Sequence, residues 1–154
     1  MSVYLSDEQA QPVDGPMILQ FAERVLSEEK LPANTEMAVL LVGADEMADY
    51  NERFMARRGP TDVLAFPVED LEPGHIPHLM PDDPPLSLGD VFLCPSEIHA
   101  RALKEKRDPE DFLFFLVAHG ILHLLGYDHE DEEQDRLMAR REEELLHLIG
   151  RKPV

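Results

Sequence analysis

The stretch of sequence that decides the fold reads DPEDFLFFLVAHGILHLLGYDH from Asp108 to His129. Its start is typical of a helix N-terminus, because Asp108 can cap the helix, Pro109 fits the first turn and two acidic residues follow. Residues 112–118 are apolar on every side, so we expect this helix to be central and buried. Gly126 predicts the end of the helix, because glycine readily adopts the left-handed turn found there.

Further strands and helices are expected on both sides of this segment. Short apolar runs bounded by Gly or Pro indicate strands, whereas apolar residues three and four positions apart indicate amphipathic helices. Asp45 is expected to cap the second helix. The predicted strands are 2–5, 36–42, 61–66 and 88–94, and the predicted helices start near 15, 45, 95 and 109, with a last one at 130–149. The last helix is expected to turn these side chains inward: Leu137, Met138, Leu145, Leu146 and Ile149.

Residues 68–87 differ in composition from the rest of the chain. They carry five prolines, one glycine and several acidic residues. Because proline lacks the backbone donor that a strand ladder or a helix interior needs, we expect a mobile surface loop outside the sheet. A length of 154 residues is close to one average domain, so residues 1–154 are expected to form a single domain that carries this loop.

Charge and cysteine content narrow the function classes. The 32 Asp and Glu residues outnumber the 14 Lys and Arg residues, a net charge of −18 that argues against a nucleic-acid or membrane binder with a broad basic face. The lone Cys94 excludes an intramolecular disulfide and fits a reducing compartment. No apolar run approaches the roughly 18 residues of a membrane span, and no basic leader precedes Asp7. We therefore expect a cytoplasmic protein with neither membrane nor disulfide partners.

Three histidines have the spacing of a metal site. His119 and His123 are four residues apart, so a helix presents both imidazoles on one face, and the turn at Gly126 can bring His129 round to them. Three imidazoles with an open fourth position are typical of a catalytic zinc site, because structural sites are usually closed by four protein ligands. The alternative is a set of hydrogen-bonded core histidines, but unpartnered imidazoles on an apolar helix cost desolvation free energy. We expect one zinc ion per chain.

The same histidine spacing occurs in the metzincin proteases, whose motif is HExxHxxGxxH. Here Gly120 stands where those proteases have glutamate. That glutamate takes a proton from the water on zinc, and glycine has no group that can do so. Peptide hydrolysis by this route is therefore disfavoured.

Three sequence blocks together resemble a known family, the YbeY endoribonucleases. The block HGILHLLGYDH at 119–129 matches the family hallmark HGxLHLxGYDH. GPTDVLAFP at 59–67 is similar to the family's PT[DN]VL[SA]FP, and LGDV at 88–91 is similar to its LGD[IV]. The blocks follow one another in family order, and the resemblance covers about residues 37–146. It implies an α/β (α+β) fold, in which a small mixed sheet of about four strands packs against about five helices, with a central buried metal-binding helix.

The resemblance also implies an activity and its partners. The implied ligands of a zinc ion are His119, His123 and His129, and the implied reaction is hydrolysis of single-stranded RNA during maturation of the small-subunit ribosomal RNA. Ribosomal RNA and ribosome-assembly proteins are the implied partners.

The chain departs from the family at one place. Many members carry Tyr-Arg before the second block, and that arginine is regarded as functional, whereas this chain has Phe54-Met55. Arg53, Arg57 and Arg58 flank the pair and suit phosphate oxygens, because a guanidinium group binds them bidentately. The alternative for each of the three is a solvated charge in a turn.

Asp128 and Cys94 are further candidates. Asp128 could orient an imidazole, accept a proton from the water at the metal, or cap the helix that follows. Cys94 could supply a thiolate ligand, but a lone cysteine at a strand end is more often buried packing.

Two other functional classes stay open. One is a ribosome-assembly factor that binds RNA or protein and uses a mainly structural metal, and the other, disfavoured by Gly120, is a metalloprotease-like hydrolase. Metal identity is also open, because three-histidine sites bind several first-row ions.

Overall fold

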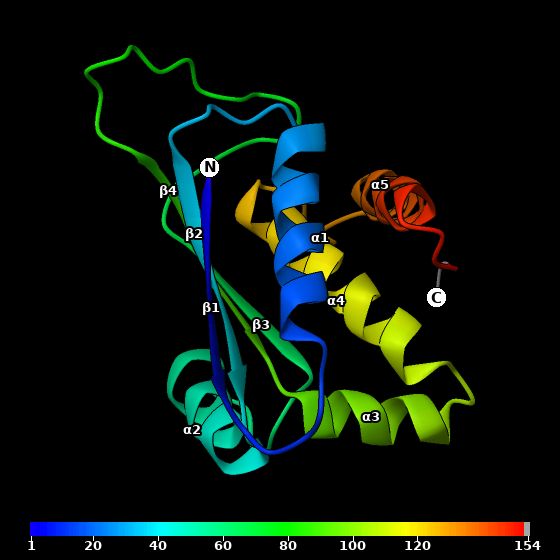
Figure 1. Cartoon of the computed structure of the whole chain (residues 1–154). Coiled ribbons are helices and arrows are strands. Elements are labelled where there is room, and N and C mark those ends of the chain that lie inside the picture. Colours follow the sequence, from blue (N-terminus) through cyan, green and yellow to red (C-terminus); the bar gives the residue numbers. More distant parts are fainter. Residues whose placement is uncertain (153–154) are drawn as a thin grey trace.

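A mixed four-stranded sheet organises the computed structural model, which describes residues 1–152. The strands are β1 (Ser2–Glu8), β2 (Thr35–Val42), β3 (Val63–Pro67) and β4 (Leu86–Leu93), arranged in the order β1-β2-β4-β3. Strands β1, β2 and β4 run parallel, whereas β3 is an antiparallel edge strand beside β4 (Figure 1). The predicted mixed sheet is confirmed.

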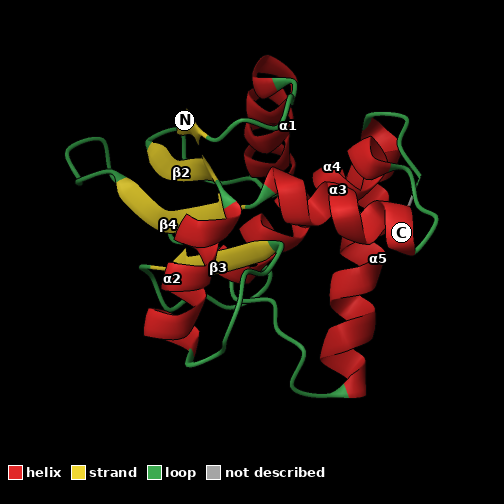
Figure 2. Ribbon diagram, turned by 90° about the horizontal axis from the view of Figure 1, so that it is seen from below, coloured by secondary structure: helices red, strands yellow, loops and turns green. Residues whose placement is uncertain are grey.

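Five helices surround this sheet, and the last of them packs on a helix and not on the sheet. They are α1 (Gly15–Glu28), α2 (Ala44–Met55), α3 (Pro95–Lys104), α4 (Pro109–Leu124) and α5 (Glu132–Leu148). Because successive side chains of a strand point to opposite faces, Val39 and Leu41 of β2 join the main core with α1 and α4, whereas Leu40 and Val42 join a small cluster under α2. The molecule therefore has a thick layer of helices on one face and α2 on the other (Figure 1, Figure 2).

Helix α4 lies at the centre of the larger core. The Asp108 side chain accepts a hydrogen bond from the backbone N–H of Asp111 at 2.9 Å and so caps the helix. Ten of the 16 helix residues are buried. Gly126 follows the helix with a φ of 99°, in the left-handed region. The predicted start, burial and end of this helix are confirmed.

Several element boundaries near the sheet differ from the sequence prediction. Strand β3 spans Val63–Pro67, whereas the prediction was 61–66. Strand β1 extends to Glu8, beyond the predicted end at residue 5. Gly43 occupies the N-cap of α2 without a side-chain hydrogen bond, so the prediction that Asp45 caps this helix is wrong. Asp45 lies in the first turn, where its charge still favours the positive end of the helix dipole. Helix α3, which the sequence pattern predicts to run through Lys106, ends at Lys104, because Lys106 has a left-handed backbone conformation.

The last helix also differs from its prediction. It starts at Glu132, two residues late, because the Asp131 side chain accepts a hydrogen bond from the backbone N–H of Gln134 at 2.8 Å and caps the helix there. Leu137 was expected to point inward, but 47% of it is exposed, while its neighbour Met138 is fully buried. The buried stripe is therefore narrower than the apolar periodicity predicts.

The proline-rich segment was predicted as a loop over 68–87, and its last two residues contradict this. Strand β4 begins at Leu86, so residues 86–87 belong to the sheet. At the other end, the backbone N–H of Val68 donates to the carbonyl of Leu88 at 3.0 Å, which continues the pairing of β3 with β4. Between these ends the structure has one isolated bridge, joining Glu72 and His75. Mobility of this segment stays a prediction.

Two further expectations concern membranes and the lone cysteine. Within residues 1–152 the helices lack the combination of length and apolar composition that a bilayer crossing requires. Cys94 is buried in the cluster under α2, as expected for a packing residue.

Candidate metal centre

Three imidazoles converge at the exposed end of helix α4. His119 and His123 lie one turn apart on α4, and His129 comes from the turn after Gly126. One nitrogen from each ring lies within 4.8 Å of the nitrogens of the other two. The structure thus brings together the three histidines whose spacing suggested a metal site.

The distance between the two helical imidazoles suits a metal ion. Nε2 of His119 and Nε2 of His123 are 3.2 Å apart. Two nitrogen donors bound to a tetrahedral zinc ion at about 2.0–2.1 Å stand about 3.3 Å apart. The chemistry and spacing of this donor pair therefore fit a zinc ion without rearrangement of α4.

Two carboxylates hold the outer nitrogens of the histidines. Oε2 of Glu142 lies 2.9 Å from Nδ1 of His119, and Oδ1 of Asp135 lies 2.6 Å from Nδ1 of His129. A carboxylate can only accept, so each Nδ1 carries the proton and donates it. Each Nε2 then keeps its lone pair for the centre of the cluster, as in the carboxylate–histidine pairs of known metal sites.

Glu142 comes from a distant helix and is held there firmly. It is only 4% exposed and lies on the buried face of α5, beside Met138, Leu145 and Leu146. Its neighbour Arg141 pairs with Glu29, at the end of α1. Packing on one side and an ion pair on the other thus fix the position of the carboxylate against α4.

Sequence analysis missed both carboxylates. A signal for Glu142 was present, because a glutamate interrupts the apolar positions 138, 145 and 146 of an amphipathic helix. A buried carboxylate needs a partner, and an unpaired imidazole elsewhere in the chain is a natural one. Asp135 gave no such signal, because it lies in an acidic first turn where charge normally serves the helix dipole.

The environment keeps His123 neutral. The pKa of His123 is lowered to about 4, chiefly by burial and also by the neighbouring rings of His119 and His129. A neutral imidazole is the form that binds a metal ion. At pH 7 this ring therefore needs no deprotonation before binding.

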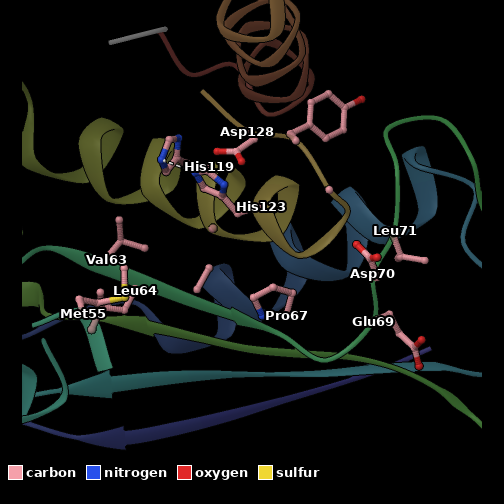
Figure 3. A pocket seen from close by; sticks show the side chains of 14 residues that line it. Met55, Val63, Leu64, Pro67, Glu69, Asp70, Leu71, His119, His123 and Asp128 are labelled. Atoms are coloured by element: carbon pink, nitrogen blue, oxygen red, sulfur yellow. Dashed lines mark hydrogen bonds between the residues drawn. The ribbon is translucent and has the colours of Figure 1, made fainter. Parts of the chain in front are cut away.

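His119 and His123 line a cavity of about 420 Å³ between α4 and the edge strand β3 (Figure 3), whereas His129 is not part of its lining. Its walls come from β3, from residues 69–71 after β3, from the turn 126–128, and from the last residue of α2. The residues that line it are Met55, Val63, Leu64, Ala65, Pro67, Glu69, Asp70, Leu71, His119, Gly120, His123, Gly126, Tyr127 and Asp128. A recessed, open cavity of this kind is what a substrate-binding site requires.

The two glycines of the histidine segment permit close packing. A Cβ added to Gly120 would lie 2.6 Å from Cγ1 of Val91, because α4 presses against β4 at this point. A Cβ on Gly126 would lie 2.0 Å from the carbonyl oxygen of Leu71, which anchors the start of the proline-rich segment against the histidine turn. The sequence indicated that Gly120 removes a general base, and the structure adds that a side chain at this position would have to displace Val91.

Asp128 lines the cavity beside the imidazoles (Figure 3). Its Oδ1 accepts a hydrogen bond from the backbone N–H of His129 at 2.7 Å. The alternative role as a cap of the last helix is wrong, because Asp131 occupies that position.

The three arginines lie outside the cavity lining. Arg53 pairs with Asp49 at 3.2 Å on the exposed side of α2. Arg57 and Arg58 are exposed in the turn that follows this helix. Of this segment, Met55 is the residue that reaches the cavity.

The fold and the site together define a class of protein, because an open three-histidine centre with carboxylate partners on an α+β scaffold is typical of metal-dependent hydrolases. The family model described as "Endoribonuclease YbeY" matches residues 5–150. The chain belongs to this endoribonuclease family.

Similarity to individual proteins extends over nearly the whole chain. Endoribonuclease YbeY of Acidothermus cellulolyticus is 42% identical, with 95% of this chain and 90% of that protein covered. The YbeY of Salinispora tropica is 38% identical, with 95% and 94% covered. Among solved structures, the solution structure of TM1509 from Thermotoga maritima is similar, with a TM-score of 0.60, 28% identity, and 97% and 91% of the two chains covered.

Proposed function

We propose that this protein is a zinc-dependent endoribonuclease that cleaves single-stranded RNA during maturation of the small-subunit ribosomal RNA. The observation that carries the proposal is the convergence of His119, His123 and His129 beside an open cavity that the first two of them line, in a chain of the YbeY family. The proposed location is the cytoplasm, and the proposed partners are ribosomal RNA and ribosome-assembly proteins.

The donor set supports one zinc ion per chain. All three donors are imidazole nitrogens, which suit zinc better than magnesium or calcium. When bound, the ion supplies Lewis-acid chemistry, either polarising a phosphoryl oxygen or lowering the pKa of a water molecule. Glu142 and Asp135 keep the rings of His119 and His129 turned so that their Nε2 atoms face the ion.

Asp128 is the proposed proton acceptor. It lines the same cavity as His119 and His123, and the hydrogen bond from His129 N–H fixes one of its carboxylate oxygens. The other oxygen remains available to take a proton from a nucleophile that attacks a phosphodiester in the cavity. This role replaces the glutamate of the metzincin motif, a side chain that would have to displace Val91 at position 120.

Single-strand specificity follows from the recessed position of the histidines. A flexible strand can bend one phosphodiester into the cavity between α4 and β3, whereas a duplex holds its phosphates on a wide, stiff surface. Arg57 and Arg58 are the proposed phosphate contacts outside the cavity, because they are exposed beside the lining residue Met55. In a chain of net charge −18, attraction of RNA must come from such local positive groups.

Single-turnover cleavage of a labelled RNA, offered as single strand and as duplex, tests the proposal. Wild type is expected to cut the single strand, and a chelator or His123→Ala is expected to abolish cleavage and metal binding. His147→Ala, which changes an exposed histidine of α5, serves as the control and is expected to cleave normally. Undiminished cleavage by His123→Ala would refute the site, and RNA binding by wild type without any cleavage would favour the assembly-factor alternative.

The arginine contacts need their own comparison. Replacing Arg57 and Arg58 together by Ala is expected to weaken RNA binding while leaving metal content unchanged. Cleavage at the wild-type rate at low RNA concentration would contradict the phosphate-contact role.

A further inference from the structure

The thinly covered face of the sheet carries a connected set of aromatic rings. Phe92 of β4 is buried under α2 and packs against Tyr50, with ring centroids 4.5 Å apart, and against Phe66, at 5.5 Å. Phe54 packs against Phe66 at 5.4 Å and against Tyr50 at 6.1 Å. The set therefore leads from a buried ring outward to Phe54, of which 56% is exposed.

Phe54 is held in place although it is exposed. Phe66 supports it from β3 with an edge-on contact, and Tyr50 supports it from one turn back along α2. A ring supported in this way presents a flat apolar surface to solvent with little freedom left to lose on binding. An isolated exposed phenylalanine would give no such platform.

The exposed ring adjoins the cavity of the histidines. The next residue, Met55, is 46% exposed and lines that cavity together with Val63 and Leu64 of β3. Figure 3 shows Met55 beside these two residues, across the cavity from the α4 imidazoles. The apolar surface thus continues from Phe54 to the cavity wall.

Positive charge surrounds the ring in an otherwise acidic molecule. The guanidinium group of Arg53 lies over the Phe54 ring, 5.3 Å from its centroid, and Arg57 and Arg58 follow within four residues. Three of the 14 basic residues therefore cluster at this end of α2. An exposed ring with arginines beside it is complementary to single-stranded RNA, in which flat bases alternate with negative phosphates. It is less complementary to a hydrophobic protein surface, which offers no partner for the arginines.

We propose that Phe54 is a stacking platform for one unpaired base of an RNA strand whose scissile phosphodiester lies at the histidine cavity. This proposal deepens the proposed ribonuclease function and rests on it. The exposed Arg53–Asp49 ion pair gains little free energy, so Arg53 can leave the ring and move to a phosphate when a base stacks there. A base already stacked in a duplex cannot use the platform, so the contact adds to the preference for single strands.

Fluorescence and kinetics with a modified RNA test the proposal. The substrates are a series of short single-stranded RNAs, each with 2-aminopurine at a different position. The fluorescence of this base is quenched when it stacks on an aromatic ring. Zinc-loaded wild type is expected to quench the 2-aminopurine fluorescence strongly at one position. Stopped-flow fluorescence would measure this quenching before cleavage occurs. Phe54→Leu is expected to lose this quenching and to raise KM by roughly 5- to 100-fold, the worth of one base–aromatic stack, with a much smaller change in kcat.

Two variants serve as controls. Phe54→Tyr keeps an aromatic face and is expected to retain both the quenching and a KM close to that of wild type. Tyr4→Leu removes an equally exposed aromatic ring from β1, away from the cavity, and is expected to behave as wild type. Circular dichroism and metal content verify that all the variants fold and load the ion.

The outcomes separate this proposal from the function on which it rests. Unchanged quenching and KM in Phe54→Leu, with cleavage intact, would overturn the platform and leave the ribonuclease function standing. Absence of RNA binding and cleavage by wild type would overturn both. A dimer in sedimentation that dissociates in Phe54→Leu would show that the ring binds a second copy of the chain, which also overturns the base-stacking role.

Discussion

The two faces of the sheet are built for different tasks. On one face, α1 and α4 bury the side chains of β2 and β4 in a continuous core, and α5 packs on α4, so this core fixes the histidines and Glu142. On the other face, α2 covers a small cluster and leaves Phe54 and Met55 exposed. The comparison teaches that groups needing accurate geometry are held by the thick face, whereas groups suited to contact a flexible strand lie on the thin one.

The largest expected contrast is in stability. Phe114 of α4 is fully buried and packs edge-on against Phe21 with ring centroids 5.5 Å apart. Phe114→Ala is expected to lower the free energy of unfolding by about 3–5 kcal/mol, through lost burial and a cavity. Phe54→Ala on the thin face is expected to change it by less than about 1 kcal/mol. Urea unfolding of both variants measures the two losses of unfolding free energy. Equal losses would contradict the proposed difference between the two faces of the sheet.

The close approach of α4 to the sheet gives the second effect. Gly120→Ala places a Cβ against Cγ1 of Val91 and is expected to destabilise the protein by about 1–3 kcal/mol through overpacking. The loss in the double variant Gly120→Ala with Val91→Ala is expected to be smaller than the sum of the losses in Gly120→Ala and in Val91→Ala, because the second substitution removes the obstructing methyl groups. Thermal unfolding measures both. A double variant whose loss is the sum of the two single losses would show that this contact does not limit the position.

Removal of the buried carboxylate separates positioning from stability. Glu142→Leu is expected to weaken zinc affinity about 10- to 100-fold, because the ring of His119 loses its orienting acceptor. Glu142→Gln is expected to weaken it less, because its amide oxygen can still accept from Nδ1 but carries no charge. The metal-free fold is expected to be no less stable, because a buried charge costs desolvation free energy. Glu143→Gln, on the exposed side of α5, is the matched control. Competition with a chelating dye measures affinity; unaltered affinity with a weaker fold would make Glu142 a structural residue only.

These predictions rest on features that the sequence reveals unequally. The sequence of residues 108–129 was enough to predict the helix, its burial and the clustering of the three histidines. All three features depend on residues close together in the chain and on helical periodicity. The partner of His119 lies 23 residues away, across a turn whose direction no local rule specifies.

Burial at element edges was equally hard to predict. Leu137 and Met138 have similar apolarity, and only the packing of α5 on α4 exposes the first and buries the second. The tight contact at Gly120 depends on Val91, a strand residue whose register is set by the whole sheet. Pairwise relations between distant elements therefore account for what sequence reasoning missed.

The last expected effect concerns pH in the metal-free protein. The folded pKa of His123, about 4, lies below its ordinary value near 6.5. Between these values the unfolded chain binds a proton that the folded chain does not, so stability is expected to fall as pH drops from about 6.5 to about 4. Melting temperatures at pH 5 and 7.5 with a chelator measure this, and His123→Gln should flatten the dependence. An equally steep dependence in that variant would assign it to other groups.

Titration of metal-free protein with zinc, followed by single-turnover cleavage of single-stranded RNA, tests the central claim most directly. If one ion held by His119, His123 and His129 supports the reaction, the cleavage rate should rise linearly and level off at about one equivalent per chain. His123→Ala, purified and titrated in the same way, should stay inactive throughout. Cleavage that is already complete without metal, or that the variant recovers at one equivalent, would contradict the account.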